Sequence, residues 1–145
     1  MNTEYQHGKF SIRMDREKMN IDFIHDYLCH QSYWANGRSL EVVEKSIRNS
    51  LCFGLFDGER QFGFARVVTD YITFAWLCDV FIAESYQGQG LGKWLVESVV
   101  SHPEMIEVKY ILLATSDAHE LYHKYGDFEA PRAIDNWMVR YNDAK

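Results

Sequence analysis

Apolar and polar residues follow two different periods along the first half of the chain. Residues 9–14 alternate as an opening strand does, whereas from Asp15 the pattern becomes helical and runs to the turn at Asn36-Gly37. The apolar positions of this helix are Ile21, Ile24, Tyr27 and Leu28. Ser39 then caps a second predicted helix. Its apolar face consists of Leu40, Val43 and Ile47.

The middle of the chain has the pattern of an antiparallel meander. Two apolar runs, 51–56 and 61–68, flank Asp57-Gly58, which is a β-hairpin signal. A third strand from 72 to 83 follows, and it leads directly into a glycine-rich stretch.

Two helices and three more strands are predicted after that stretch. A helix follows Gly92 and stops near His102-Pro103, and 110–114 is an apolar run typical of a central strand. Asp117 is expected to cap a short helix that runs through Tyr125 and ends at Gly126. The runs 128–133 and 137–141 are expected to form a closing pair of strands.

The glycine-rich stretch is the first candidate for chemistry. Gly88, Gly90 and Gly92 lack β-carbons, and they lie where a helix begins, so unpaired N–H groups and the positive end of the helix dipole can bind a phosphate. A Walker loop is excluded, because Gln87 stands at its first glycine and Trp94 at its Ser/Thr. A G-x-G-x-x-G dinucleotide fingerprint also fails.

Gln87, Gly90 and Gly92 do fit the pattern Q/R-x-x-G-x-G/A after an apolar strand. This pattern resembles the acetyl-CoA loop of the GCN5-related N-acetyltransferase (GNAT) family, and the order of the predicted elements is similar over nearly the whole chain. The resemblance implies the α/β acyl-CoA N-acyltransferase fold: a mixed sheet of six to seven mostly antiparallel strands and four helices. That sheet is splayed between its fourth and fifth strands, here 72–83 and 110–115, and acyl-CoA lies in the wedge.

A second motif supports the resemblance. Ala118, Leu121, Tyr122 and Gly126 match A-x-x-L-Y-x-x-x-G-F, although Asp127 separates the glycine from the phenylalanine. In the family the tyrosine is the general acid that protonates the departing thiolate, so the resemblance assigns this role to Tyr122; alternatively, Tyr122 is a core aromatic.

The resemblance also implies the acetyl-CoA contacts. The backbone of the strand would pair with the pantetheine arm, and the loop would hold the pyrophosphate. These residues are Val80, Phe81, Ile82, Gln87, Gly88, Gln89, Gly90, Leu91, Gly92 and Lys93.

The sequence indicates the residues that bind the acceptor amine less specifically than it indicates the acetyl-CoA loop. Asp79 is a carboxylate in an apolar strand, which makes it a candidate for the general base or an amine anchor, with a structural hydrogen-bonding role as the alternative. Tyr33, Trp34 and Trp76 are candidates for the acceptor pocket, although aromatics at such positions also fill cores.

A zinc site competes for the same helix. His119, Glu120 and His123 form H-E-x-x-H, the pattern of zinc metalloproteases. The helix is short and no zincin-like strand precedes it, so we expect no metal and rank this alternative lowest.

Composition narrows the class of protein. The chain has 145 residues, 47% of them hydrophobic, which predicts a single domain over 1–145. A net charge of −6 without a basic run argues against nucleic acid. Neither a membrane-spanning run nor a signal peptide is recognisable, and three widely spaced cysteines indicate a reducing compartment, so a cytoplasmic protein is expected.

The resemblance implies an enzyme that transfers an acetyl group directly from acetyl-CoA to a primary amine of a small molecule or peptide. A protein that binds acyl-CoA without chemistry is the alternative. Relatives in the family are often dimers, so a homodimer is a further expectation.

Overall fold

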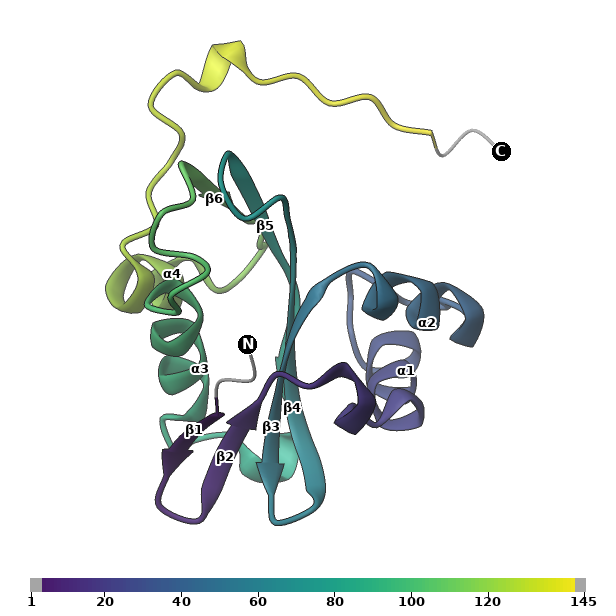
Figure 1. Ribbon diagram of the computed structural model, residues 1–145. Coiled ribbons are helices and arrows are strands. Elements are labelled where there is room, and N and C mark those ends of the chain that lie inside the picture. The colour runs from purple at the N-terminus through teal and green to yellow at the C-terminus, as the bar shows by residue number, and fades with distance from the viewer. Residues whose placement is uncertain (1–3, 143–145) are drawn as a thin grey trace.

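The computed structural model describes residues 4–142 and contains one six-stranded mixed sheet (Figure 1). Its strands lie in sequence order; β1 to β5 pair antiparallel, and β5 and β6 pair parallel. They are β1 (Glu4–His7), β2 (Phe10–Arg13), β3 (Leu51–Asp57), β4 (Arg60–Thr69), β5 (Phe74–Ile82) and β6 (Tyr110–Leu112). The mixed α/β fold that the sequence predicted is therefore confirmed.

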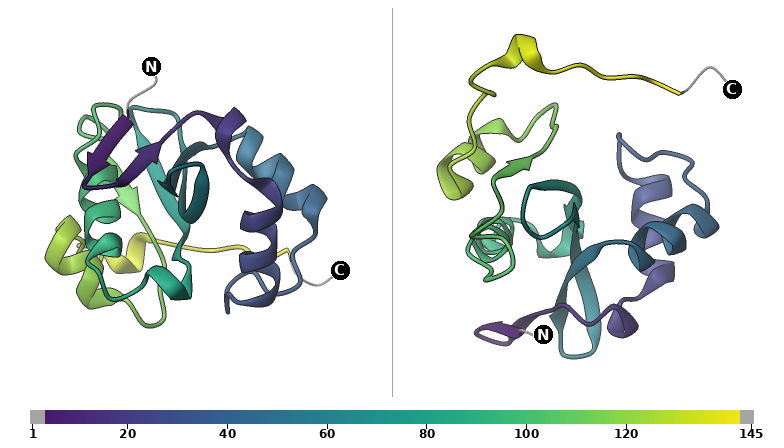
Figure 2. Two further views of the ribbon diagram at one scale, coloured as in Figure 1. Left: turned by 90° about the horizontal axis from the view of Figure 1, so that it is seen from below. Right: turned by 45° about the horizontal axis from the view of Figure 1, so that its top comes forward.

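Helices cover both faces of this sheet (Figure 2). One pair, α1 (Ile21–His30) and α2 (Leu40–Arg48), packs on one face, and α3 (Leu91–Val100) and α4 (His119–Gly126) pack on the other. Three 3-10 turns complete the described elements: η1 (Arg16–Lys18), η2 (Glu84–Tyr86) and η3 (Ile134–Asn136). Two separate hydrophobic clusters result, one on each side of the sheet.

Local sequence signals explain where the first helices begin. Ser39 Oγ accepts a hydrogen bond from Val42 N at 3.3 Å, which confirms the predicted cap of α2. The first helix begins at Ile21 rather than at Asp15, because Asn20 caps it, whereas Asp15 caps the short turn η1.

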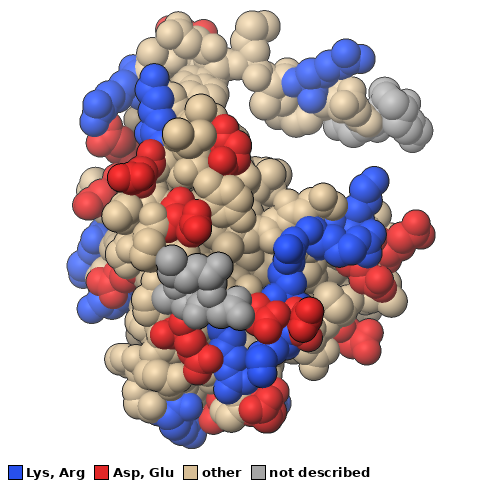
Figure 3. Space-filling view, viewed as in Figure 1, with Lys and Arg blue, Asp and Glu red and all other residues tan. Residues whose placement is uncertain are grey.

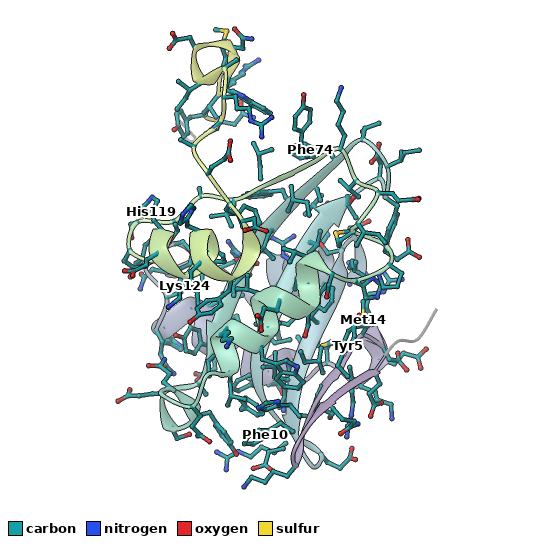
Figure 4. All side chains as sticks on the ribbon, turned by 90° about the vertical axis from the view of Figure 1, so that its left-hand side faces the viewer. Tyr5, Phe10, Met14, Phe74, His119 and Lys124 are labelled. Atoms are coloured by element: carbon teal, nitrogen blue, oxygen red, sulfur yellow. The ribbon has the colours of Figure 1, made fainter. Side chains whose placement is uncertain are left out.

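The opening strand was predicted without its partner. It forms β2, and β1 pairs with it, so that Tyr5 lies opposite Ile12. Figure 4 shows the labelled side chains of Tyr5 and Phe10 on this outer hairpin. Because most of β1 is exposed, its sequence carries no apolar alternation.

The expected closing strands, 128–133 and 137–141, are wrong for the single chain. Residues 127–142 form no strand; apart from η3 they are irregular, and nearly all of them are exposed. The alternating pattern is present, but among residues 4–142 no backbone hydrogen bond joins residues 138–142 to a strand.

The expected cap of α4 by Asp117 is also wrong. The helix begins at His119, and its cap position is Ala118, which has no side-chain acceptor. Thr115 Oγ1 instead accepts a hydrogen bond from Ala118 N at 3.1 Å, so a threonine turn leads into the helix.

Within residues 4–142 no helix combines the length and apolarity that crossing a bilayer requires.

Candidate active site

A β-bulge interrupts β5 at Asp79. Arg66 of β4 pairs with Cys78, and Phe64 pairs with Phe81, so one residue of β4 faces two residues of β5. Asp79 has a φ of 52°, in the left-handed region that few non-glycine residues adopt. The extra residue reverses which side chains face α3 and α4, and it locally breaks the hydrogen-bond ladder.

The sheet opens beside this bulge. Strands β5 and β6 pair only from Phe74 and Tyr110 to Trp76 and Leu112; beyond this point β5 continues to Ile82 paired with β4 on one edge and with no strand on the other. A cavity of about 830 Å³ lies along the unpaired part of β5. It runs from the glycine-rich loop, past the β6–α4 connection, to the loop between α1 and α2. Residues 77–82, including Val80, Phe81 and Ile82, form one of its walls.

The glycine-rich loop closes one end of the cavity. Gly88 and Gly90 have φ values of 82° and 77°, and Gly90 is the N-terminal cap of α3. A Cβ built on either of them, or on Gly92, meets no atom within 4 Å, so the space in front of this backbone is open. The N–H groups at the start of α3 have no acceptor within the helix. An open backbone at a helix N-terminus is suited to binding a phosphate group.

The other loop residues differ in their position relative to the cavity. Gln87, Leu91 and the three glycines line it, and Gln87 Nε2 donates to Ile82 O at 2.9 Å, which ties the loop to the end of β5. Gln89 and Lys93 are not part of the cavity wall. The Lys93 ammonium group instead lies 5.1 Å from the centre of the Tyr125 ring on α4.

Tyr122 projects from α4 into the same cavity. Its side chain is 8% exposed and packs edge-to-face against Phe128 at 5.9 Å. Burial, with smaller contributions from Asp117 and Tyr33, raises the pKa of Tyr122 to about 12. The phenol is therefore protonated at neutral pH. Asp127, which interrupts the G-F motif, takes the left-handed position after α4, and Phe128 folds back over Gly126.

Asp79 is held by three donors. Its side chain is 1% exposed, and Oδ2 accepts hydrogen bonds from Arg38 Nη1 at 2.8 Å and from Arg66 Nε at 2.9 Å. Oδ1 accepts from Trp34 Nε1 at 2.9 Å. The carboxylate therefore connects the loop between α1 and α2 to the sheet at the bulge.

Tyr33 spans the opposite end of the cavity. Its hydroxyl accepts a hydrogen bond from Ser116 N at 2.9 Å, so the α1–α2 loop contacts the β6–α4 connection. Hydrogen bonds from Ser116 lower the pKa of Tyr33. The ring packs edge-to-face on Trp34 at 5.0 Å, and Trp76 lines the same end. The three predicted acceptor-pocket residues therefore line one cavity together with Asp79 and Tyr122.

Sequence reasoning missed Arg66 and Ser116. A signal for Arg66 existed, because it is a lone cation in an apolar strand of a predicted hairpin whose next strand contains Asp79. No comparable signal exists for Ser116, whose contact with Tyr33 joins residues 83 positions apart.

The H-E-x-x-H residues do not converge. His123 Nδ1 lies 3.0 Å from Phe128 O, and Figure 4 shows His119 on the side of α4 turned away from α3. In the described part of the chain no three His, Cys, Asp or Glu residues are placed to share a metal ion.

Comparison with known proteins identifies the family to which this fold belongs. The family model described as acetyltransferase (GNAT) domain matches residues 48–126, from the end of α2 through α4, which is more than half of the chain. The chain belongs to the GNAT family. It is therefore an acyltransferase of a family that uses acetyl-CoA.

Relatives of this GNAT protein are found among bacteria, fungi and plants. A GNAT-family crystal structure from Xanthomonas campestris pv. campestris is 40% identical, with a TM-score of 0.88 over 94% of each chain. FG08082 of Gibberella zeae, named as an acetyltransferase, is 25% identical over 91% of this chain and 89% of its own. GCN5-related N-acetyltransferase 2 of Arabidopsis thaliana is 40% identical over 63% of this chain and 38% of its own length.

Proposed function

We propose that this GNAT protein is an N-acetyltransferase that moves an acetyl group from acetyl-CoA to a primary amine of a small molecule or peptide. One observation supports this proposal above the others: a single cavity joins the open N–H cradle of α3 to Tyr122 and to an aromatic pocket. A Elizabethkingia anophelis GNAT acetyltransferase of similar fold has been solved with acetyl-CoA bound, with a TM-score of 0.62 at 17% identity.

The backbone supplies most of the acetyl-CoA contacts in this proposal. N–H groups from Gly88 to Lys93 hold the diphosphate, and the unpaired edge of Val80, Phe81 and Ile82 pairs with the pantetheine arm as an added strand does. The bulge at Asp79 leaves backbone donors outside the ladder, and one of them stabilises the carbonyl oxygen as it gains charge. The thioester is already activated, so positioning the amine beside it supplies much of the rate.

Tyr122 is proposed as the general acid. It carries its proton at neutral pH and gives it to the sulfur as the C–S bond breaks. The amine attacks in its neutral form, and the proton that its nitrogen then loses returns through solvent to the Tyr122 phenolate, so that the products are the amide and the free thiol. Direct transfer to the amine fits the state of the cysteines: burial raises the pKa values of Cys52 and Cys78 to about 12, so neither is a thiolate that could accept the acetyl group first.

Asp79 is proposed as a positioning residue rather than as the base. Both carboxylate oxygens already accept hydrogen bonds, two of them from guanidinium groups. In this role Asp79 holds Trp34 and Arg38 against the bulge. These contacts fix the distance between the acceptor pocket and strand β5, whose edge binds acetyl-CoA. Trp34, Tyr33 and Trp76 then form the apolar walls that receive the amine.

The proposed partners are the amine acceptor and a second copy of the chain. The second partner is supported by the apolar residues near the C-terminus, which lie exposed in a single chain.

Replacing Tyr122 with Phe tests the proposed chemistry. Thiol release from acetyl-CoA, measured over a panel of primary amines, should show a turnover number about a hundredfold lower, with little change in the KM for acetyl-CoA. Tyr125→Phe is the matched control, because Tyr125 lies on the same helix but does not line the cavity. Equal turnover in Tyr122→Phe and the unmodified protein would remove Tyr122 from the mechanism.

A further inference from the structure

A second carboxylate, Asp117, lines the cavity at the connection between β6 and α4. The residue is exposed, and it lies two positions before α4, where an aspartate ordinarily caps the helix. Here the cap position belongs to Ala118, whose N–H donates to Thr115 Oγ1. Among residues 4–142 no hydrogen bond or ion pair engages the Asp117 carboxylate. This carboxylate is therefore available to a ligand in the cavity.

Asp117 lies close to the two tyrosines at this end of the cavity. Its neighbour Ser116 donates its N–H to the Tyr33 hydroxyl at 2.9 Å, and Tyr122 follows one helical turn after Ala118, with Tyr122 N donating to Ala118 O at 3.3 Å. Burial is the main cause of the raised pKa of Tyr122, and the negative charge of Asp117 adds to it. The same charge opposes the hydrogen bonds from Ser116 that lower the pKa of Tyr33. Because such effects weaken with distance, the carboxylate lies near both hydroxyls.

The other acids of the cavity are less suited to accept a proton. Both oxygens of Asp79 already accept hydrogen bonds, two of them from guanidinium groups. Burial raises the pKa of Cys78 to about 12, and it also raises the pKa values of Tyr27 and Tyr86, so these groups keep their protons at neutral pH. Among the described residues no histidine lines the cavity. Asp117 is the group on this wall that can take up a proton.

The surroundings of Asp117 suit an acceptor that arrives as a cation. Primary amines are ammonium ions at neutral pH, and the three aromatic side chains of the acceptor pocket present ring faces that attract a cation. Arg38 and Arg66 do not compete for the carboxylate, because both donate to Asp79. Partial removal of the ammonium group from water also favours loss of its proton.

We propose that Asp117 binds the acceptor as an ammonium ion and takes up the proton that the nitrogen must lose before it attacks. This inference rests on the N-acetyltransferase function proposed above and names the residue that prepares the nucleophile. One N–H bond breaks, its electron pair stays on nitrogen, and the carboxylate becomes a carboxylic acid. Because Asp117 is exposed, it then returns the proton to water. The neutral amine forms the C–N bond, and the later proton transfers involve Tyr122.

Asp117→Asn tests this role. With the amine of the panel that is acetylated fastest, the turnover number should fall about a hundredfold and the KM for the amine should rise, while the KM for acetyl-CoA stays unchanged. Asp117→Glu restores a carboxylate and should keep at least about a tenth of the unmodified turnover. Asp127→Asn is the matched control, because Asp127 lies outside this cavity and asparagine tolerates its φ of 57°. Unchanged turnover in Asp117→Asn would overturn the proposal.

Two nucleophiles of similar shape separate proton removal from a general disturbance of the site. Phenethylamine is an ammonium ion at neutral pH, whereas O-benzylhydroxylamine is neutral and has no proton to lose before it attacks. Asp117→Asn should slow acetylation of the first about a hundredfold and of the second by less than about threefold. Equal losses with both would overturn the role of Asp117 and leave the N-acetyltransferase function standing. An unmodified protein that releases no thiol with any amine would overturn both.

Discussion

At the scale of single residues, Asp79 shows how one side chain can serve the site without touching the reacting atoms. A carboxylate in an apolar strand drew attention in the sequence, but its three donors come from residues 34, 38 and 66. The bulge that turns it toward these donors depends on a backbone φ of 52°, which sequence patterns do not reveal. The residue was predictable, whereas its role required the contacts.

Asp79→Asn should therefore destabilise the fold. The substitution leaves Arg38 and Arg66 without their counter-charge in a nearly dry environment, and the free energy of unfolding should fall by about 3 kcal/mol. Urea denaturation measures the loss. Asp117→Asn, the same change at an exposed carboxylate of the cavity, should stay within about 0.5 kcal/mol. Full stability of Asp79→Asn together with lost turnover would instead identify Asp79 as the base.

At the scale of elements, the start of α3 meets two conflicting demands: the formation of a stable helix and the close approach of a ligand to its backbone. Glycine is a poor helix former, yet Gly92 lies within the first turn of the helix. A helix chosen for stability alone would have alanine there, because a Cβ at Gly92 meets nothing within 4 Å. The glycine makes sense if the backbone must be approached closely by a ligand.

Gly92→Ala should separate these demands. We expect the melting temperature of the free protein to rise slightly, since alanine favours the helix by up to about 1 kcal/mol, while the dissociation constant for acetyl-CoA increases. Differential scanning fluorimetry and calorimetric titration measure the two quantities. Unchanged or tighter acetyl-CoA binding in Gly92→Ala would argue against the proposed cradle.

The turn after α3 contains a buried histidine that makes the stability of the fold depend on pH. His102 is fully buried against Phe53; its Nδ1 accepts a hydrogen bond from Glu104 N at 2.9 Å, and its Nε2 has no partner in the described structure. Desolvation lowers the pKa of His102. The folded state thus binds this proton less readily than the unfolded chain does, and stability must fall as the pH drops below the unfolded value of about 6.5.

His102→Asn should remove this dependence on pH. The asparagine oxygen can still accept from Glu104 N, but the side chain does not titrate. The substitution should lower stability at neutral pH through lost packing, yet flatten the decline of the unfolding free energy between about pH 6.5 and pH 5. Urea denaturation over this range tests it; equal slopes in both proteins would assign the decline to other groups.

At the scale of the whole molecule, the sequence predicted features that depend on neighbouring residues well, and it predicted contacts between distant segments poorly. The Ser39 cap, the Asp57-Gly58 hairpin and the helix periods depend on neighbours in the chain, and these features formed as predicted. The bulge, the Tyr33–Ser116 contact and the unpaired residues 138–142 depend on segments brought together by folding. The opening between β5 and β6 was expected only from the resemblance to a family, because hydrophobic periodicity does not indicate where a sheet splays.

The net charge favours a small-molecule or peptide acceptor over nucleic acid. Acidic and basic side chains are interspersed on the face in Figure 3, and the net charge is −6. The apolar acceptor end of the cavity lies between two halves of the molecule that Tyr33 and Asp79 hold together. Its walls, more than the surface charge, are expected to select the amine.

A crystal structure of the protein with CoA tests the central claim most directly. The account predicts that the diphosphate oxygens lie about 3 Å from backbone nitrogens between Gly88 and Lys93, and that the sulfur lies within hydrogen-bonding reach of the Tyr122 hydroxyl. CoA bound outside the opening between β5 and β6, or a diphosphate held by side chains away from α3, would contradict it.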